Sequence, residues 1–212
     1  GGGGGGSGGG GGVNKRILCF CNSVDETHRV FLILDALRGR GALSVAEYAS
    51  HLSQAERTAT LHRFREGKAQ VLIASDAATR GLDVEGVEVV VNYDAPLHAK
   101  TYVHRAGRTA RARKAGHAYT LVRADEAPAF AALLAKATRA HGRAAEPHAL
   151  EPVALEALAP AVEAAAEAAK RTLAAEAGKK TKEGGATAAQ RLVASQAAHH
   201  FGLRLKTHIA AA

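Results

Sequence analysis

The sequence predicts an α/β fold in which a parallel β-sheet carries helices on both faces. Between about residues 15 and 122, short runs of β-branched and aliphatic residues alternate with longer amphipathic segments. These runs are apolar at nearly every position, as expected of strands that are buried on both sides. Strands and helices that alternate in this way form parallel sheets with right-handed crossovers. Ligands of such sheets bind at the carboxyl ends of the strands.

The chain divides into three parts. Residues 1–12 are eleven glycines and one serine, which have no side chains to bury, and we expect a disordered linker there. Residues 13–142 hold the predicted sheet, and residues 143–212 form an Ala-rich, partly helical extension. The chain contains no Met, and we therefore interpret it as part of a longer protein.

The apolar runs are short enough to be strands rather than helices. At the first of them, Cys19 and Cys21 would point to one face of the sheet, where they cannot bridge each other. We interpret both as reduced, half-buried core residues, which is typical of a cytosolic or nuclear protein. The expected strands are, in order, Arg16–Phe20, Ser44–Tyr48, Gln70–Ala74, Glu88–Asn92 and His117–Val122.

Helices are expected where apolar residues recur with helical spacing. Ser53 and Glu56 have the spacing of a capping box, which predicts that the second helix begins directly after Ser53. In the extension, Ala and Glu dominate to about residue 177, and Pro147, Pro152 and Pro160 are expected to break the pattern. Because Ala-rich helices bury little surface per residue, we expect the extension to be loosely attached. The expected helices of the sheet domain are Val24–Leu37, Gln54–Arg65, His98–Arg105 and Asp125–His141.

The formal net charge of +8 suits a polyanionic partner such as a nucleic acid. Charge alone does not separate nucleic-acid binding from simple solubility, so the positions of the arginines decide. No apolar stretch approaches the roughly 18 residues of a membrane span, and no signal peptide is visible. We therefore expect no membrane association.

Three arginines form the most informative group. Arg105, Arg108 and Arg111 follow one another at spacings of three residues, with Gly107 letting the backbone bend between them. On one edge their guanidinium groups would repel one another unless an anion lay among them. A triphosphate or a nucleic-acid backbone is the natural counter-charge. The alternative interpretation is a solvated basic turn.

A second segment indicates a binding crevice after the third strand. It carries a hydroxyl at Ser75, carboxylates at Asp76 and Asp83, and a guanidinium at Arg80. An ordinary connecting loop needs neither the arginine nor two carboxylates. Such polar groups are expected at a ligand site at the carboxyl end of a strand.

A third, weaker signal lies at the start of the helix that follows Ser53. Gln54 and Arg57 are three residues apart and would flank an anion held by the free amides and dipole of the helix N-terminus. Many helices that begin in this way bind nothing, so this segment gains weight only together with the others.

Taken in this order, the segments resemble the DEAD-box RNA helicases of helicase superfamily 2 over about residues 15–123. The resemblance is most specific at His104–Arg111, which looks like motif VI of that family. The motif sequences are closest to the subgroup that works on large-ribosomal-subunit assembly. The resemblance implies a RecA-like (P-loop NTPase-like) fold. The other similar segments are Ile17–Ser23 (motif IV), Gln54 with Arg57 (motif IVa), Ser75–Asp83 (motif V) and Val89–Pro96.

The resemblance also implies a role for each matching residue. Arg108 and Arg111 would be arginine fingers that reach the γ-phosphate of ATP, and Asp83 would bind the ATP ribose. His104 and Arg105 would couple this cleft to the other lobe. The contacts to the RNA backbone would come from Gln54, Arg57, Arg80 and Ser75, the last standing where the family usually has Thr.

The chain has no G-x-x-x-x-G-K-[ST] loop to cradle phosphates and no Asp-Glu-Ala-Asp segment to hold Mg²⁺. The resemblance therefore implies an N-terminal RecA-like lobe of the same protein that holds ATP with Mg²⁺, and it implies that this chain alone is inactive. The expected function is ATP-driven unwinding of RNA duplexes in ribosome biogenesis. The expected partners are RNA, the N-terminal lobe and pre-ribosomal proteins. The expected location is the nucleus, in particular the nucleolus, with the cytoplasm as the alternative.

Two alternatives remain open at this point. A lone lobe could bind RNA or an assembly partner without meeting ATP, and a superfamily 2 helicase directed to DNA is the second. No metal site is expected, because the histidines show no ligand spacing and His199–His200 has no nearby Cys or carboxylate pair to complete one. The histidines assigned to the surface or to a satisfied core are His28, His51, His62, His98 and His117.

Overall fold

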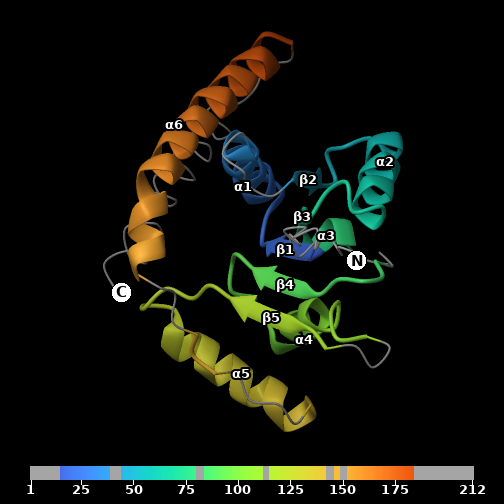
Figure 1. Cartoon of the computed structure of the whole chain (residues 1–212), viewed down its shortest axis with the longest axis vertical. Coiled ribbons are helices and arrows are strands. Elements are labelled where there is room, and N and C mark those ends of the chain that lie inside the picture. The colour runs from blue at the N-terminus through green and yellow to red at the C-terminus, as the bar shows by residue number, and fades with distance from the viewer. Residues whose placement is uncertain are drawn as a thin grey trace, which may run out of the picture.

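The computed structural model describes residues 15–38, 44–79, 84–111, 115–141, 146–148 and 152–183. Within these residues a single parallel sheet has the strand order β2-β3-β1-β4-β5 (Figure 1). Each expected strand is present, and its ends lie within two residues of the expected bounds. The strands are β1 (Ile17–Cys21), β2 (Val45–Tyr48), β3 (Val71–Ser75), β4 (Val89–Asn92) and β5 (His117–Thr120).

The expected helices are also present, together with a short one that the sequence did not predict. The additional helix, α3, spans only Asp76–Thr79 and follows β3 directly. A helix of a single turn has no apolar periodicity by which it could be recognised. The others are α1 (Val24–Ala36), α2 (Gln54–Arg65), α4 (Ala99–Ala106), α5 (Ala127–His141) and α6 (Pro152–Glu183).

The core has two layers, one on each face of the sheet. On one face, α1 packs against a cluster that contains Val30, Ile73 and both cysteines. Cys19 and Cys21 share this face without a bridge between them, as predicted, but they are buried rather than half-buried. Hydrogen bonding with Cys19, followed by burial, raises the pKa of the Cys21 thiol well above its ordinary value. Cys21 is therefore an unreactive core residue.

On the other face, α2 and α3 cover the cluster around Leu18, Phe20 and Phe64. The chain leaves β1 toward β2 on one side, whereas it leaves β4 toward β5 on the other side. The carboxyl ends of the adjacent strands β1 and β4 therefore form the switch point of the sheet, where doubly wound folds bind their ligands.

Helix α6 runs along α1, on the side of α1 that faces away from the sheet (Figure 1). Ile33 of α1 packs there against Ala165 and Ala169 of α6, and all three are buried. Small side chains let the two helices approach closely. The expectation of a loose attachment is therefore wrong for this part of the extension.

The prediction that Pro160 breaks the helix is also wrong, because α6 continues through it. Proline lacks the N–H that would bond to the carbonyl of Glu156, but both residues are exposed, so water can reach that carbonyl. None of the described helices combines the length and the hydropathy that a membrane crossing needs.

Candidate functional site

The carboxyl ends of three strands are joined by one buried guanidinium. Arg105 of α4 is 1% exposed. Its Nε and Nη2 donate to the carboxylate of Asp76, at the end of β3, over 2.8 and 2.5 Å. Nη2 also donates to Oδ1 of Asn22, after β1, over 2.7 Å, and Nη1 donates to the backbone carbonyl of Asp94, after β4, over 2.9 Å. Nη1 lies 3.5 Å from Oδ1 of Asn92 as well, so each of the five N–H groups faces an acceptor in this domain.

The loops after β1 and β4 are also bonded to each other. The backbone N–H of Asn22 donates to Oδ2 of Asp94 over 2.9 Å, and Nδ2 of Asn22 donates to the carbonyl of Ala95 over 3.1 Å. Arg105 was predicted to couple the cleft to another lobe. Because its donors are used within the domain, its side chain can influence another lobe only through the strand ends that it holds.

A pocket of about 150 Å³ opens beside this network. Arg108 and His104, two of the predicted site residues, line it together with Arg105, so the structure brings these three together. A guanidinium and an imidazole at the mouth of a small pocket suit an anionic group. The pocket is smaller than the roughly 300 Å³ of a complete small-molecule site, so a nucleotide would need further walls. The remaining lining residues are Phe20, Asp76, Thr79 and Thr101.

Arg111 is not among the residues that line this pocket. It is exposed, and its Nε donates to the carbonyl of Gly107 over 2.8 Å. Between the two arginines, the buried Thr109 hydroxyl lies 2.8 and 2.9 Å from the carbonyls of Val87 and Glu88, just before β4. Ala110 then adopts a left-handed φ of 55°. The backbone between Arg108 and Arg111 is therefore held in an anchored turn.

The first turn of α2 has the predicted capping box. Oγ of Ser53 accepts from the N–H of Glu56 over 3.3 Å, and Oε2 of Glu56 accepts from the N–H of Ser53 over 2.8 Å. Hydrogen bonding with the Ser53 side chain, and then with its backbone, lowers the pKa of Glu56 below its ordinary value. On the same turn, Arg57 donates through Nη2 to Oε1 of Gln54 over 2.8 Å. The predicted pair thus lies together on the surface, at the edge of the sheet where β2 ends.

Replacing Ser53 with alanine is expected to lower the free energy of unfolding by about 1 kcal/mol, because the N–H of Glu56 loses its acceptor. Urea denaturation followed by circular dichroism measures the change. Thr58→Ala is the matched control, since the Thr58 hydroxyl bonds back to the carbonyl of Gln54 within the helix and caps nothing. Equal losses in the two variants would show that the cap does not hold this turn.

Three predicted site residues remain: Ser75, Arg80 and Asp83. Ser75 ends β3, is 2% exposed, and its Oγ has no hydrogen-bond partner among the described residues. Its hydroxyl is therefore enclosed rather than presented at the surface. Arg80 and Asp83 lie outside the described residues. Sequence reasoning missed Asn22 and Asp94 as partners of Arg105, although polar residues directly after apolar runs were a signal for them.

Comparison with known proteins identifies the sheet domain. Residues 12–113 match the family described as helicase conserved C-terminal domain. The chain is 48% identical over 122 residues to the Homo sapiens protein named ATP-dependent RNA helicase DDX51, an alignment that covers 58% of this chain and 18% of that protein. It is 47% identical over 105 residues to the ATP-dependent rRNA helicase rrp3 of Botryotinia fuckeliana (strain B05.10), covering 50% of this chain and 21% of that protein. The chain thus spans about a fifth of the length of these two curated relatives.

A solved structure agrees with these relatives. The C-terminal domain of the DEAD-box protein Dbp5 is 28% identical, with a TM-score of 0.51, over 60% of this chain and 71% of that one. Residues 12–113 contain strands β1 to β4 and the Arg105 network described above. Residues 12–113 therefore belong to the helicase conserved C-terminal domain family, and the sheet domain is a RecA-like C-terminal lobe of the DEAD-box type.

Proposed function

We propose that this lobe is the C-terminal half of the catalytic unit of an ATP-dependent RNA helicase. The observation that carries the proposal is the incomplete pocket at the carboxyl edge of the sheet, which Arg108 and His104 line. A site with cationic groups but too small for a nucleotide fits one half of a composite site. A second RecA-like lobe of the same protein would supply the other half.

In this proposal, Arg108 and Arg111 are arginine fingers. When the two lobes close over ATP, Arg108 places a delocalised positive charge against the γ-phosphate, where negative charge spreads in the transition state. Arg111 starts from the surface, so its approach to the same phosphate requires the companion lobe to cover it. Asp83 holds the ribose. The Arg105 network keeps the strand ends in place, and His104 transmits closure at the rim of the pocket.

The residues of the pocket do not suit Mg²⁺. Asp76 is its only carboxylate among the described residues, and Arg105 already neutralises it. Mg²⁺ prefers oxygen ligands and would therefore be held by the companion lobe together with the ATP phosphates. This lobe would contribute positively charged side chains that face the phosphates.

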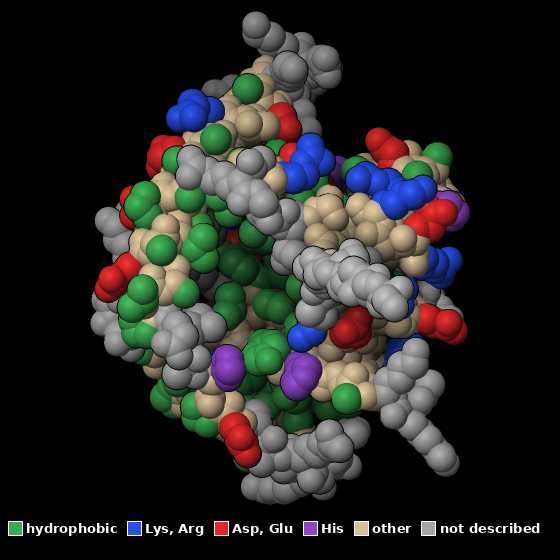
Figure 2. Space-filling model, viewed as in Figure 1, with side chains coloured by type: hydrophobic (Ala, Val, Ile, Leu, Met, Phe, Trp, Pro, Cys, Tyr) green, Lys and Arg blue, Asp and Glu red, His purple; other side chains and the backbone are tan. Residues whose placement is uncertain are grey.

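RNA would bind along the same edge of the sheet. Figure 2 shows Lys and Arg side chains gathered over and beside α2, and that helix carries Arg57, Arg63 and Arg65. Gln54 and Arg57 would contact the sugar-phosphate backbone at its first turn, and Arg80 would also contact it. The proposed RNA contact of Ser75 would require a local shift at the end of β3, because its hydroxyl is enclosed. Such contacts carry no base information, so recognition would be largely independent of sequence. Closure on both ligands would bend the RNA and locally melt a duplex, and hydrolysis would release it.

Ribosome biogenesis is the proposed setting of this activity, which implies pre-ribosomal partners and a nucleolar location. The support is the 47% identity to a protein named an rRNA helicase. Pull-down of tagged full-length parent protein, followed by RNA sequencing, would show enrichment of pre-ribosomal RNA. Enrichment of messenger RNA alone would contradict this setting.

The chain by itself is expected to bind single-stranded RNA weakly and to hydrolyse no ATP. Fluorescence anisotropy with a labelled RNA oligonucleotide measures the association constant for RNA. Its logarithm should fall linearly as the logarithm of the salt concentration rises, because binding releases cations from the RNA phosphates. Arg57→Ala should reduce that slope by about one. Lys170→Ala on α6, whose ammonium pairs with Glu167, is the control and should leave the slope unchanged. ATP turnover by the chain alone would contradict the need for a companion lobe.

A further inference from the structure

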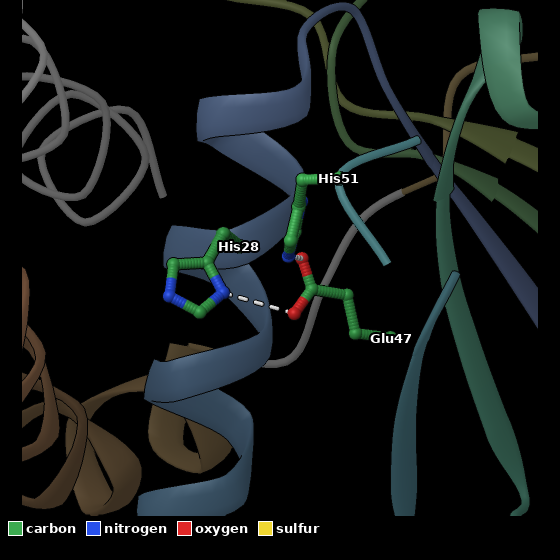
Figure 3. A group of neighbouring side chains, drawn as sticks. All are labelled: His28, Glu47 and His51. Atoms are coloured by element: carbon green, nitrogen blue, oxygen red, sulfur yellow. Dashed lines mark hydrogen bonds and ion pairs between the residues drawn. The ribbon is translucent and has the colours of Figure 1, made fainter. Parts of the chain in front are cut away.

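Two imidazoles and a buried carboxylate meet on the α1 face of the sheet, opposite the face that carries α2 (Figure 3). His28 comes from α1, Glu47 from β2, and His51 from the turn that follows β2. One nitrogen or oxygen atom from each of the three lies within 4.8 Å of the other two. None of these residues takes part in the nucleotide or RNA contacts proposed above.

The Glu47 carboxylate is buried and only partly satisfied. The residue is 8% exposed, although a carboxylate on a buried strand is rare. Its Oε2 lies 2.9 Å from Nδ1 of His28. Its Oε1 has no hydrogen-bond partner in the part of the chain that the structure describes, and Nε2 of His51, at 3.6 Å, is too distant for a hydrogen bond. Burial of such an oxygen costs free energy unless a positive group satisfies it.

The donor set and its spacing both suit zinc. Zn²⁺ takes imidazole nitrogen and carboxylate oxygen at about 2.0–2.1 Å, so ligand atoms of a tetrahedral site lie about 3.3 Å apart. Nδ1 of His28 lies 2.9 Å from Oε2 of Glu47, and Nε2 of His51 lies 3.6 Å from Oε1, so each nitrogen is near that separation from one oxygen of the carboxylate. The rings of His28 and His51 are 5.5 Å apart and inclined at 78°, so they converge edge to face rather than stacking. Small side-chain rotations would complete three ligand positions.

A fourth residue supports His28 from outside the cluster. Oε2 of Glu176, in α6, lies 3.0 Å from Nε2 of His28. A histidine that donates one N–H to a carboxylate presents its other nitrogen to a metal, an arrangement common around metal-binding histidines. Helix α6 would thereby be joined to the ligand set as well as to the apolar surface of α1.

We propose that Nδ1 of His28, the carboxylate of Glu47 and Nε2 of His51 bind a zinc ion, with Glu176 orienting His28. Water completes the tetrahedron, because His51 is 42% exposed and leaves the cluster open on its side. The competing occupant is a proton, which would make His28 an imidazolium between Glu47 and Glu176. Hydrogen bonding to Glu47, which outweighs burial, raises the pKa of His28, so a proton competes with the metal for this site.

The test is a competitive titration of the metal-free chain against a chromophoric chelator at pH 7.5. All proteins carry His199→Ala and His200→Ala, which remove a histidine pair that could bind metal by itself. The wild-type cluster should bind about one equivalent of Zn²⁺, and Co²⁺ in its place should show the strong visible absorption of tetrahedral coordination. The melting temperature should rise with zinc concentration.

Three variants and one control decide the outcome. His51→Ala, at an exposed position, and Glu47→Gln should each weaken zinc binding by more than about 100-fold, because each removes a ligand. Glu176→Gln should weaken it by about 10–100-fold, as expected for an outer carboxylate. The control is His62→Ala, which removes an exposed histidine whose Nδ1 lies 3.2 Å from Glu66 and which is outside the cluster.

Tight binding that is lost in His51→Ala and kept in His62→Ala supports the site. Absence of zinc binding in the wild-type cluster, or unchanged binding in His51→Ala, would mean that only a proton occupies it and would overturn the proposal. Because circular dichroism of His51→Ala reports the fold independently, loss of binding cannot be mistaken for unfolding.

Discussion

Replacing Arg108 with alanine in the full-length parent protein is expected to lower the kcat of RNA-stimulated ATP hydrolysis by about 10³–10⁵-fold. Arg108 lines the pocket at the carboxyl edge of the sheet, where its guanidinium can face a phosphate. The charge that it stabilises develops in the transition state, so kcat falls while the KM for ATP changes little. Steady-state phosphate release with and without RNA measures both quantities.

The design separates chemistry from folding. Arg108→Lys keeps one positive charge without the bidentate geometry and should recover only part of the lost rate. Arg111→Ala should also lower kcat strongly, since both arginines are proposed as fingers. Lys170→Ala, on α6, should leave the rate unchanged. Turnover near the wild-type rate in Arg108→Ala, with an unchanged melting temperature, would refute the assignment of the finger.

Replacing Arg105 with alanine is expected to lower the free energy of unfolding by about 3–5 kcal/mol, as for other buried charged networks that lose one partner. The change leaves acceptors on Asn22, Asp76 and Asp94 without their donor. It also removes the guanidinium that lies 5.2 Å from the centre of the Phe20 ring. Equilibrium urea denaturation of the chain gives the difference directly.

Arg123→Ala is the matched control for this prediction. Arg123 forms an ion pair with Asp125 at the surface, with side chains 20% and 63% exposed, and exposed pairs contribute at most about 1 kcal/mol. Arg105→Lys should give an intermediate loss, because three donors replace five. If Arg105→Ala cost no more than Arg123→Ala, the network would not be what holds the strand ends together.

Strands β1, β2 and β3 were predictable from sequence because they are buried on both faces, so apolar residues occupy successive positions. β3, for example, is buried at every residue from Val71 to Ser75. For β5, at the edge of the sheet, the expected burial on both sides is wrong, because the strand is exposed from His117 to Tyr119. Helix ends with a local signal were equally predictable, and the capping box at Ser53 sets the start of α2 at Gln54 as expected. The continuation of α6 through Pro160 was not, because local propensity does not record that the freed carbonyl faces water.

The candidate site was only partly predictable. Equal spacing suggests that Arg105, Arg108 and Arg111 act alike, but α4 ends at Ala106, so Arg105 turns into the domain while the other two follow a separate turn. The partners of Arg105 are distant in sequence, with Asn22 83 residues away. The cluster of His28, Glu47 and His51 combines three elements of the fold, and only the packing of α1 against β2 brings it together.

The strand order has a consequence for the way the chain acquires its structure during synthesis. β1 lies at the centre of the sheet, yet its neighbours are β3 and β4 rather than β2, which follows it in sequence. Ile17 of β1 pairs with Val71 of β3 and with Val89 of β4, so both edges of β1 are paired only after residue 89 has been synthesised. A chain emerging from the ribosome therefore exposes an apolar strand until most of the domain has been translated. Such late, non-local pairing slows folding and favours aggregation of truncated products, so chaperones would be needed early rather than late.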